Sequence, residues 1–329
     1  MSMRDHSRPR INRDELVMIT VLGQVAPPLE RLGPWRIGAD GTPRHLPGSG
    51  GIVLSHRVGD RCVGLAADHV EPGVSIRNEA RAGDGAANQA LQSYACIGNF
   101  AVIQSGRALG SRGVVVGKHG GIDNVLLDFP LAVMRRMAIG DRVQVYAYGI
   151  GARLIDYPDI RLVNCAPRLI AKWRLWDSDG RLSIPVTHVV PARLMGSGLG
   201  KNNVIRGDYD IQLSDPEAVR RHRLGSLRFG DIVAIEDADN RFGRSQHGAF
   251  VSVGVVVHSE STVAGHGPGV VTLLSGPADQ IAIRRDPAAN IATILGIRQA
   301  APPQPRLPLP EREARERQRA ATRLPVLTE

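Results

Sequence analysis

The sequence first draws attention to a histidine flanked by acids. Residues 67–73 read ADHVEPG, which places Asp68, His69 and Glu71 within four positions. Asp68 and His69 could hold a divalent metal ion, or His69 could act as a catalytic base oriented by the carboxylate of Asp68. A polar turn with a surface histidine is the alternative. Adjacent residues of a strand point to opposite faces, so the pair can meet one ligand only if the backbone turns there.

The segment GKHGG at residues 117–121 combines a cation, an imidazole and backbone amides. A glycine-rich loop of this kind suits an anion, so we expect Lys118, Gly120 and Gly121 to bind a ligand and His119 to act as a catalytic base. Of 41 basic residues only three are lysines, and a lysine kept in such a loop favours a need for a compact charge. The alternative is a hairpin turn with a solvated lysine.

A second glycine-rich segment, GSGLGK, covers residues 196–201. Its spacing matches neither a P-loop nor the turn that exposes a nucleophilic serine in hydrolases. We therefore predict that Ser197, Gly198 and Lys201 cradle a ligand, in preference to Ser197 acting as a nucleophile. A plain turn stays open as an alternative.

Two acids follow at positions i and i+2. Asp208 and Asp210 share one face if the chain is extended there, which suits a metal pair or an acid–base pair. We predict Asp68, Asp208, Asp210 and His266 as ligands of a divalent metal ion, with surface acids of a turn as the alternative. His258 and His266 could also meet across a hairpin as metal ligands, although hydrogen-bonded structural histidines are equally open.

These landmarks recur along the chain. The triplet at 196–198 follows Gly48-Ser49-Gly50 by 148 positions, and His266 follows His119 by 147. A period of this length indicates two whole domains of one origin, because solenoid repeats are far shorter. We expect the two halves to share one strand order. The expected division is a flexible N-terminus (1–14), a first domain (15–152), a second domain (153–298) and a disordered or partly helical tail (299–329) that is dispensable for folding.

Short apolar or alternating runs bounded by Gly and Asp predict the fold class. We expect a mainly β, β-rich α+β protein of two small barrel- or sandwich-like domains with few short helices. The expected strands are 15–25, 50–58, 99–104, 113–117, 124–129 and 141–149, then 181–190, 209–213, 231–237, 248–259 and 269–275. The expected helices are 86–93, 216–223 with Asp215 as N-cap, and 277–284.

Composition narrows the functional classes. Hydrophobic residues make up 43% and charged residues 22% of the chain, which is typical of a soluble globular protein. No apolar run is long enough to span a membrane, and the N-terminus has no signal-peptide pattern. Three cysteines without a CxxC spacing fit a reducing cytoplasm. The net charge is +9, but the arginines are scattered among acids, so specific nucleic-acid binding is not favoured.

Several of these segments occur in one combination. PGSGGIVLSHRVGD at 47–60, DHVEPG, GKHGG, MGSGLG with GDYDIQ, and GHGPGV follow one another in this order. In this combination the chain resembles a bacterial and archaeal family catalogued as domain of unknown function 4438, which is described in an N-terminal and a C-terminal part. The resemblance covers residues 15 to about 298 and implies a two-part chain. It implies no activity, so no residue role is carried over from it.

The residues therefore predict a hydrolase or lyase that acts on a small polar or anionic molecule by acid–base or metal-assisted chemistry. Ligand sites favour domain interfaces, so we expect residues 117–121 to line a pocket shared with the second half. The alternative is a non-catalytic protein that binds a small ligand or serves in an assembly. We also expect a homo-oligomer.

Overall fold

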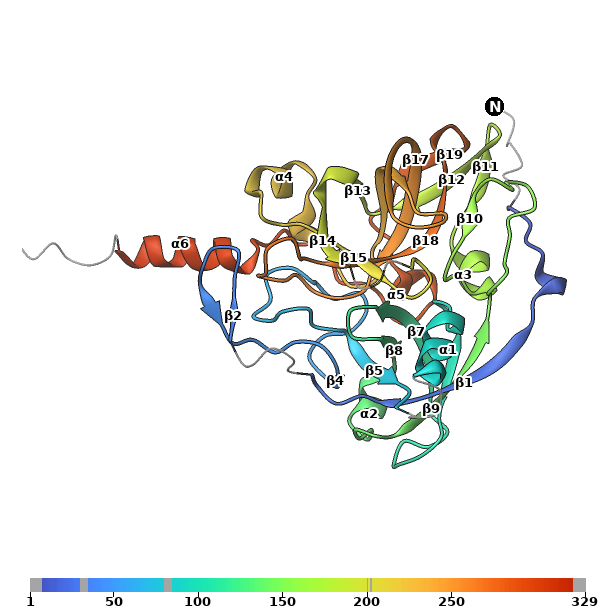
Figure 1. The fold of residues 1–329 in the computed structure, drawn as a ribbon, viewed down its shortest axis with the longest axis horizontal. Coiled ribbons are helices and arrows are strands. Elements are labelled where there is room, and N and C mark those ends of the chain that lie inside the picture. The colour runs from blue at the N-terminus through green and yellow to red at the C-terminus, as the bar shows by residue number, and fades with distance from the viewer. Residues whose placement is uncertain (1–7, 30–34, 80–84, 200, 202, 322–329) are drawn as a thin grey trace, which may run out of the picture.

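The chain folds into two β-rich halves that pack against each other (Figure 1). The computed structural model describes residues 8–29, 35–79, 85–199, 201 and 203–321. Within this part, no helix is long and apolar enough to cross a membrane. The expected β-rich fold class is confirmed.

The first half is a closed barrel. Its strands, in spatial order, are β1 (Met18–Val25), β9 (Arg142–Tyr148), β6 (Phe100–Ile103), β7 (Arg112–His119), β8 (Asn124–Asp128) and β5 (Gly73–Arg77). β1 also pairs with β5, through Gln24 opposite Arg77, and this pairing closes the six-stranded ring. The short β4 (Ile52–Val53) extends the sheet beyond β5.

The second half is an open half-barrel. Its strands, in spatial order, are β13 (His188–Pro191), β16 (Ile232–Asp239), β17 (Ser245–Val256), β18 (Gly269–Pro277), β15 (Asp208–Ile211) and β14 (Met195–Leu199). β10 (Arg161–Leu162) pairs with β18 beside them. A separate sheet holds β11 (Trp176–Ser178), β12 (Arg181–Val186) and β19 (Ile281–Arg285), and β2 (Arg36–Ile37) pairs with β3 (Pro43–Arg44) in a hairpin.

The two halves share one strand order, as the duplication predicts. With β9 left out, the spatial order β1, β6, β7, β8, β5, β4 corresponds to β13, β16, β17, β18, β15, β14. The pairing of β1 with β5 that closes the first barrel has no counterpart between β13 and β15 in the described part of the chain. The first half differs by inserting β9 between β1 and β6. Because β9 is antiparallel to both, β1 runs parallel to β6, just as β13 runs parallel to β16. The domain limits at residues 152 and 298 stay a prediction.

Helices are short, with 4 to 13 residues each. They are α1 (Ala86–Tyr94), α2 (Leu131–Met134), α3 (Pro167–Lys172), α4 (Pro216–Arg221), α5 (Ile291–Ile294) and α6 (Leu309–Ala321), with 3₁₀ turns at Arg13–Glu15, Ala192–Leu194, Leu224–Ser226 and Ala278–Gln280. Asp215 caps α4 as predicted, because its side chain accepts a hydrogen bond from the Glu217 amide.

One expected helix, at 277–284, is wrong. The segment forms a 3₁₀ turn and then β19, which pairs in parallel with β12. Pairing with a distant strand outweighs the local helix preference of these residues. The strand β5 was not expected at all, because its apolar run is only five residues long and directly follows Pro72.

The halves share a continuous apolar core. Val116 and Leu126 of the first barrel belong to the same buried cluster as Val255 and Leu273 of the second half. At Gly117 the backbones come so close that an added Cβ would lie 2.7 Å from Val257 Cγ1. A glycine is therefore required where β7 meets the segment that follows β17.

The tail is held more firmly than the sequence predicts. The Ala301 amide donates to Gly59 O and the Arg306 amide to Gly225 O, and Leu309 is buried. α6 then extends away from the body (Figure 1). Residues 322–329, and residues 1–7 of the N-terminus expected to be flexible, lie outside the described part.

Candidate metal centre

Six side chains converge where the two halves meet. They form two groups of three whose ligand atoms lie within 4.8 Å of one another. We call His69, Asp210 and His266 the outer trio, and His119, Asp208 and His258 the inner trio. Each trio contains two histidines and one aspartate, and each draws on both halves of the chain.

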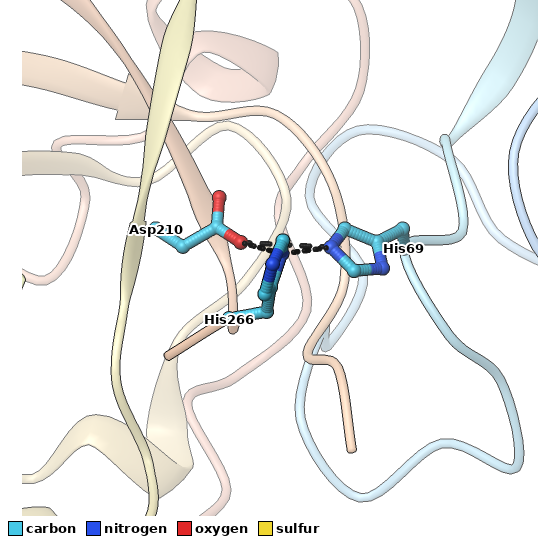
Figure 2. Close-up of side chains that lie close together, drawn as sticks. All are labelled: His69, Asp210 and His266. Atoms are coloured by element: carbon cyan, nitrogen blue, oxygen red, sulfur yellow. Dashed lines mark hydrogen bonds and ion pairs between the residues drawn. The ribbon is translucent and has the colours of Figure 1, made fainter. Parts of the chain in front are cut away.

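The outer trio has the spacing of metal ligands (Figure 2). His69 Nε2 lies 3.0 Å from His266 Nδ1 and 3.5 Å from Asp210 Oδ2, and the latter two atoms are 3.3 Å apart. Ligands placed tetrahedrally at about 2.1 Å from a zinc ion are separated by about 3.4 Å. The three atoms therefore need little movement to coordinate one ion.

The inner trio is more deeply enclosed. His258 Nε2 lies 2.8 Å from Asp208 Oδ2, and the rings of His119 and His258 stack with centroids 4.3 Å apart. All three side chains are buried. The Gly120 amide donates to Asp208 Oδ1 at 2.7 Å and so fixes this carboxylate from the first half.

Asp210 stands between the two trios. Its Oδ1 lies 3.4 Å from His258 Nε2 of the inner trio, while its Oδ2 faces both histidines of the outer trio. The two oxygens of one carboxylate thus serve different trios. Carboxylates in this position bridge pairs of metal ions about 3.5–4 Å apart in two-metal enzymes.

Each of three histidines is held by a partner on its other ring nitrogen. His69 Nδ1 bonds to Asp68, His119 Nδ1 lies 2.8 Å from Glu71 Oε1, and His258 Nδ1 lies 2.9 Å from Ser259 O. In metal sites such partners fix the ring and its tautomer. With the proton on Nδ1, each Nε2 is the nitrogen that can present a lone pair to a cation once it has released any proton of its own.

The carboxylates of Asp68 and Glu71 are themselves held in place. Asp68 accepts bonds from Ser261 Oγ and Thr262 Oγ1, both at 3.1 Å. Glu71 is fully buried and accepts bonds from the Gly50 amide, Ser75 Oγ and Asn124 Nδ2. Asp68 and Glu71 therefore hold the histidines of the trios through their Nδ1 atoms and are not members of the trios.

The backbone at His69 explains how it reaches the site. His69 has a φ of 54°, so the chain turns there and the side chains of Asp68 and His69 meet. A turn at this position is the condition under which these two adjacent side chains can lie together. It makes Asp68 the orienting partner of His69, and the structure does not group Asp68 with the predicted metal ligands.

The trios attract positive charge. Burial by itself lowers the pKa of His258, but the carboxylates of Asp210 and Asp208 outweigh it and raise that pKa well above its usual value. The pKa of His69 is also raised, because Asp210 and Asp68 outweigh burial. Burial by itself raises the pKa of Asp210, and the surrounding histidines reverse this and hold it well below its usual value. A site with these preferences suits a cation.

Two glycines let the backbone approach the trios. A Cβ on Gly198 would lie 2.4 Å from Asp210 Oδ2 and 2.8 Å from His266 Nδ1. A Cβ on Gly269 would lie 2.1 Å from His258 Nε2 and 2.6 Å from Asp208 Oδ2. Gly198 therefore contacts the predicted site, whereas Ser197 beside it is exposed to solvent.

Lys118 has a different environment from the one expected. It lies in β7, not in a loop, and its fully buried ammonium donates to Asn164 Oδ1 at 2.6 Å and Ile205 O at 2.8 Å. Burial lowers the pKa of Lys118 to about 8. Residues 117–121 do contact the second half, but none of the three described cavities is lined by them, so the shared pocket stays a prediction. The ammonium, however, binds the protein itself and is not presented to an anion.

The other predicted ligand-binding residues lie near the trios. The turn that follows β7 starts at Gly120 and continues through Gly121. Lys201 Nζ lies 3.1 Å from Asp123 Oδ1, an ion pair that links the two halves. Whether Lys201, Gly121 or Ser197 binds a ligand stays a prediction.

Sequence reasoning missed two parts of the centre. His258 was considered as a partner of His266, but the loop between them places the two histidines in different trios. Glu71 was noted as a neighbouring acid without a role. The spacing of Glu71 two positions from His69 was an available clue, but its partner His119 lies 48 residues further along the chain.

Comparisons with known proteins agree with the two-part division. The family model described as Domain of unknown function (DUF4438), N-terminal, matches residues 35–171, and the C-terminal model matches residues 172–295. A solved structure titled "Crystal structure of TM1086" is 40% identical, covers 87% of this chain and 99% of its own, and has a TM-score of 0.81. No curated protein sequence matches. The chain belongs to the DUF4438 family, as its motifs predict.

Proposed function

We propose that this member of the DUF4438 family is a hydrolase that uses two divalent metal ions to cleave a small polar molecule where its two halves meet. The observation that carries the proposal is the position of Asp210, with one carboxylate oxygen toward each trio. Two ions held in this way lower the pKa of a bound water and polarise a carbonyl or phosphoryl oxygen.

The residues of the chain divide the remaining work. Asp210 sets the distance between the two metal positions, and Glu71 and Asp68 keep His119 and His69 in the tautomer that offers Nε2. The Gly120 amide holds Asp208 so that its other oxygen faces His258. The site is thus organised before an ion arrives.

The ligand set favours zinc. Four imidazoles and two carboxylates form the trios, and no thiol belongs to them. Imidazole suits Zn²⁺ and other late divalent metals, whereas sites for Mg²⁺ or Ca²⁺ are built from oxygen ligands. Zn²⁺ is the first ion to test and Mn²⁺ the second.

Access favours the outer position and a small substrate. The side chain of His266 is 35% exposed, while that of Asp210 is 3% exposed. Three cavities in the described part of the chain, of about 640, 650 and 560 Å³, are lined by residues outside both trios. A substrate would therefore approach past His266 and Ser197 with only its reacting group. Cytoplasmic location and homo-oligomerisation stay predictions from the sequence.

The proposal is tested on protein purified without a histidine tag. Metal content is measured, and hydrolysis of small esters, amides and phosphate esters is assayed before and after chelation. We expect at least one class to be hydrolysed, the activity to disappear on chelation, and Zn²⁺ or Mn²⁺ to restore it. The Asp210→Asn variant should be inactive, whereas Asp215→Asn, which preserves the cap of α4, should be active.

One result would favour the alternative function. If the protein binds two ions per chain and hydrolyses none of these classes, a non-catalytic role in ligand or metal binding fits better. If it binds no ion, both the metal centre and the hydrolase are wrong.

A further inference from the structure

We infer that the C-terminal helix α6 controls the outer metal position, so that docking of α6 and binding of an ion to the outer trio favour each other. The inference rests on the proposed function and concerns the regulation of the same site. Two chains of contacts connect α6 with His69. They leave α6 at different residues, and both reach His69 by way of residues 260–262.

The first connection passes through Glu260. This buried carboxylate accepts a hydrogen bond from the Leu309 amide, where α6 begins, at 3.3 Å. It also accepts bonds from the amides of Gly64 at 2.6 Å and Leu65 at 3.0 Å. The carbonyl of Glu260 accepts a bond from the His69 amide at 3.1 Å. One residue therefore links the start of α6 with the backbone of an outer ligand.

The second connection passes through the β2–β3 hairpin. Glu313 of α6 pairs with Arg44 at 2.7 Å, and Arg44 pairs with Asp40 at 2.8 Å. The amide of Ala39 donates to Thr262 O at 2.8 Å. Thr262 Oγ1 in turn donates to Asp68, the carboxylate that orients His69. Figure 1 shows this hairpin beside the first part of α6.

The inner trio depends less on these contacts. Its His119 is oriented by Glu71, whose partners are Gly50, Ser75 and Asn124. Asp208 is held by the Gly120 amide. None of these bonds involves the tail. His258 bonds to Ser259 O, next to Glu260, but Ser259 is also held by its own amide bond to Val70 O. Loss of α6 should therefore weaken the outer position and leave the inner one largely unchanged.

The docking of α6 rests on few contacts. Leu309 is buried and Arg312 donates to Gly64 O at 2.9 Å, but most residues beyond Glu313 are exposed. At Gly64, an added Cβ would lie 2.9 Å from Arg306 Cβ, so the tail packs directly on this backbone. A segment held by so few contacts can open locally without unfolding the body. Coupling between two such events is necessarily reciprocal.

The experiment uses Zn²⁺ titrations of the metal-free full chain, of a chain ending at Pro308, and of two point variants. We expect truncation to weaken the outer ion about tenfold, within the usual range of coupling, and to leave the inner ion unchanged. Glu313→Gln should weaken the outer ion about twofold, because the lost ion pair is partly exposed. Glu316→Gln is the matched control, since the ion pair that Glu316 makes in the described part of the chain is with Arg312 of its own helix and is long, at 3.8 Å.

The reciprocal effect is read with trypsin on the full chain. Cleavage after Arg306 and Arg312 should slow when Zn²⁺ fills the outer trio, because both residues contact the body where the tail docks. In the Gly198→Ala variant, in which a Cβ crowds the outer trio, Zn²⁺ should no longer give this protection.

The outcomes separate this inference from the function on which it rests. Two bound ions with affinities unchanged by truncation and by Glu313→Gln would overturn the inference alone. Equal weakening of both ions would overturn the selective link to the outer trio. If the full chain binds no ion, the proposed function fails and the inference fails with it. If the truncated chain does not fold, the comparison of Glu313→Gln with Glu316→Gln decides.

Discussion

The outer and inner trios are built from the same residue types but differ in their contact with solvent. Each has two histidines and one aspartate, and each takes ligands from both halves. The inner side chains are buried, whereas the side chains of His266 and His69 are 35% and 12% exposed. An ion in the inner trio would act mainly as part of the fold, and an ion in the outer trio would meet the substrate.

The difference also shows how the two copies of the duplicated unit diverged. His266, which the sequence repeat aligns with His119, belongs to the outer trio, whereas the structural counterpart of His119 is the end of β17, just before His258, and both His119 and His258 belong to the inner trio. Both carboxylates of the trios come from the second half, while two carboxylates of the first half, Asp68 and Glu71, bond to histidines. The centre is therefore shared between the halves and is not repeated in each of them.

The largest effect is expected at Asp210, because this residue contacts histidines of both trios. Because Asp210 faces both trios, Asp210→Asn should reduce the affinity of both ions by about 100-fold or more, beyond the 10–100-fold typical of outer-sphere changes. Calorimetric titration with Zn²⁺ measures this. Loss of one ion alone would show that Asp210 belongs to a single trio.

Substitutions of Gly198, which is close to the outer trio, and of Gly269, which is close to the inner trio, test the two trios separately. Gly198→Ala should abolish the outer ion and retain the inner one, because the new Cβ would meet Asp210 and His266. Gly269→Ala should damage the inner trio first and should also lower the melting temperature. Metal content and thermal unfolding measure both effects.

A suitable control for these variants is Gly243→Ala, since a Cβ at Gly243 meets no atom within 4 Å. It should leave both ions in place. If Gly198→Ala and Gly269→Ala lost the same ion, the two positions would not be independent.

His188 is a buried histidine outside both trios. Its pKa is lowered, whereas the pKa values of His69 and His258 in the trios are raised. Burial lowers the pKa of His188 to about 4, and His188 is bonded to Thr187 and Ser226. In the unfolded chain the pKa of this histidine is about 6.5. Between about pH 4 and pH 6.5, the unfolded chain therefore binds a proton at His188 and the native protein does not. Stability should therefore fall by up to about 3 kcal/mol as the pH drops from about 6.5 to about 4.

Denaturant unfolding of metal-free protein at several pH values measures this loss. In His188→Gln the pH dependence should be shallower by that amount, whereas His247→Gln, at an exposed site, should keep the full slope. Equal slopes in all three proteins would contradict the buried neutral state of His188.

The smallest effect is expected at the rim, in the ion pair of Lys201 with Asp123. Both side chains are about one third exposed, so Lys201→Met should cost about 1 kcal/mol of stability or less. Raised salt should remove the difference from the wild-type protein. A larger loss that survives high salt would mean that Lys201 has a further role.

The sequence singled out most of the side chains that converge but not their grouping, and metal binding by Asp208, Asp210 and His266 stays a prediction. The repeat predicted two halves with one strand order, and Asp208, Asp210 and His266 were predicted as ligands from residue type and spacing. Sequence spacing cannot show which loop of the first half meets which loop of the second. His258 was therefore assigned the wrong partner, and Asp68 was predicted as a ligand although it lies behind His69.

Lys118 is a second residue whose environment depends on a partner distant in the sequence. Its glycine-rich surroundings predicted an exposed loop, but the continuation of β7 to His119 buries it against Asn164. The tail gives a third example. Its composition predicted weak attachment, whereas the bond of Leu309 to Glu260 depends on a partner 49 residues away that no local pattern reveals.

The central claim is that two ions share Asp210, and anomalous diffraction from crystals of the Zn²⁺-loaded protein tests it most directly. Data collected above and below the zinc edge should show two peaks about 3.5–4 Å apart, one within each trio, with Asp210 between them. A single peak, or no peak with His69 and His258 hydrogen-bonded directly to Asp210, would contradict the account.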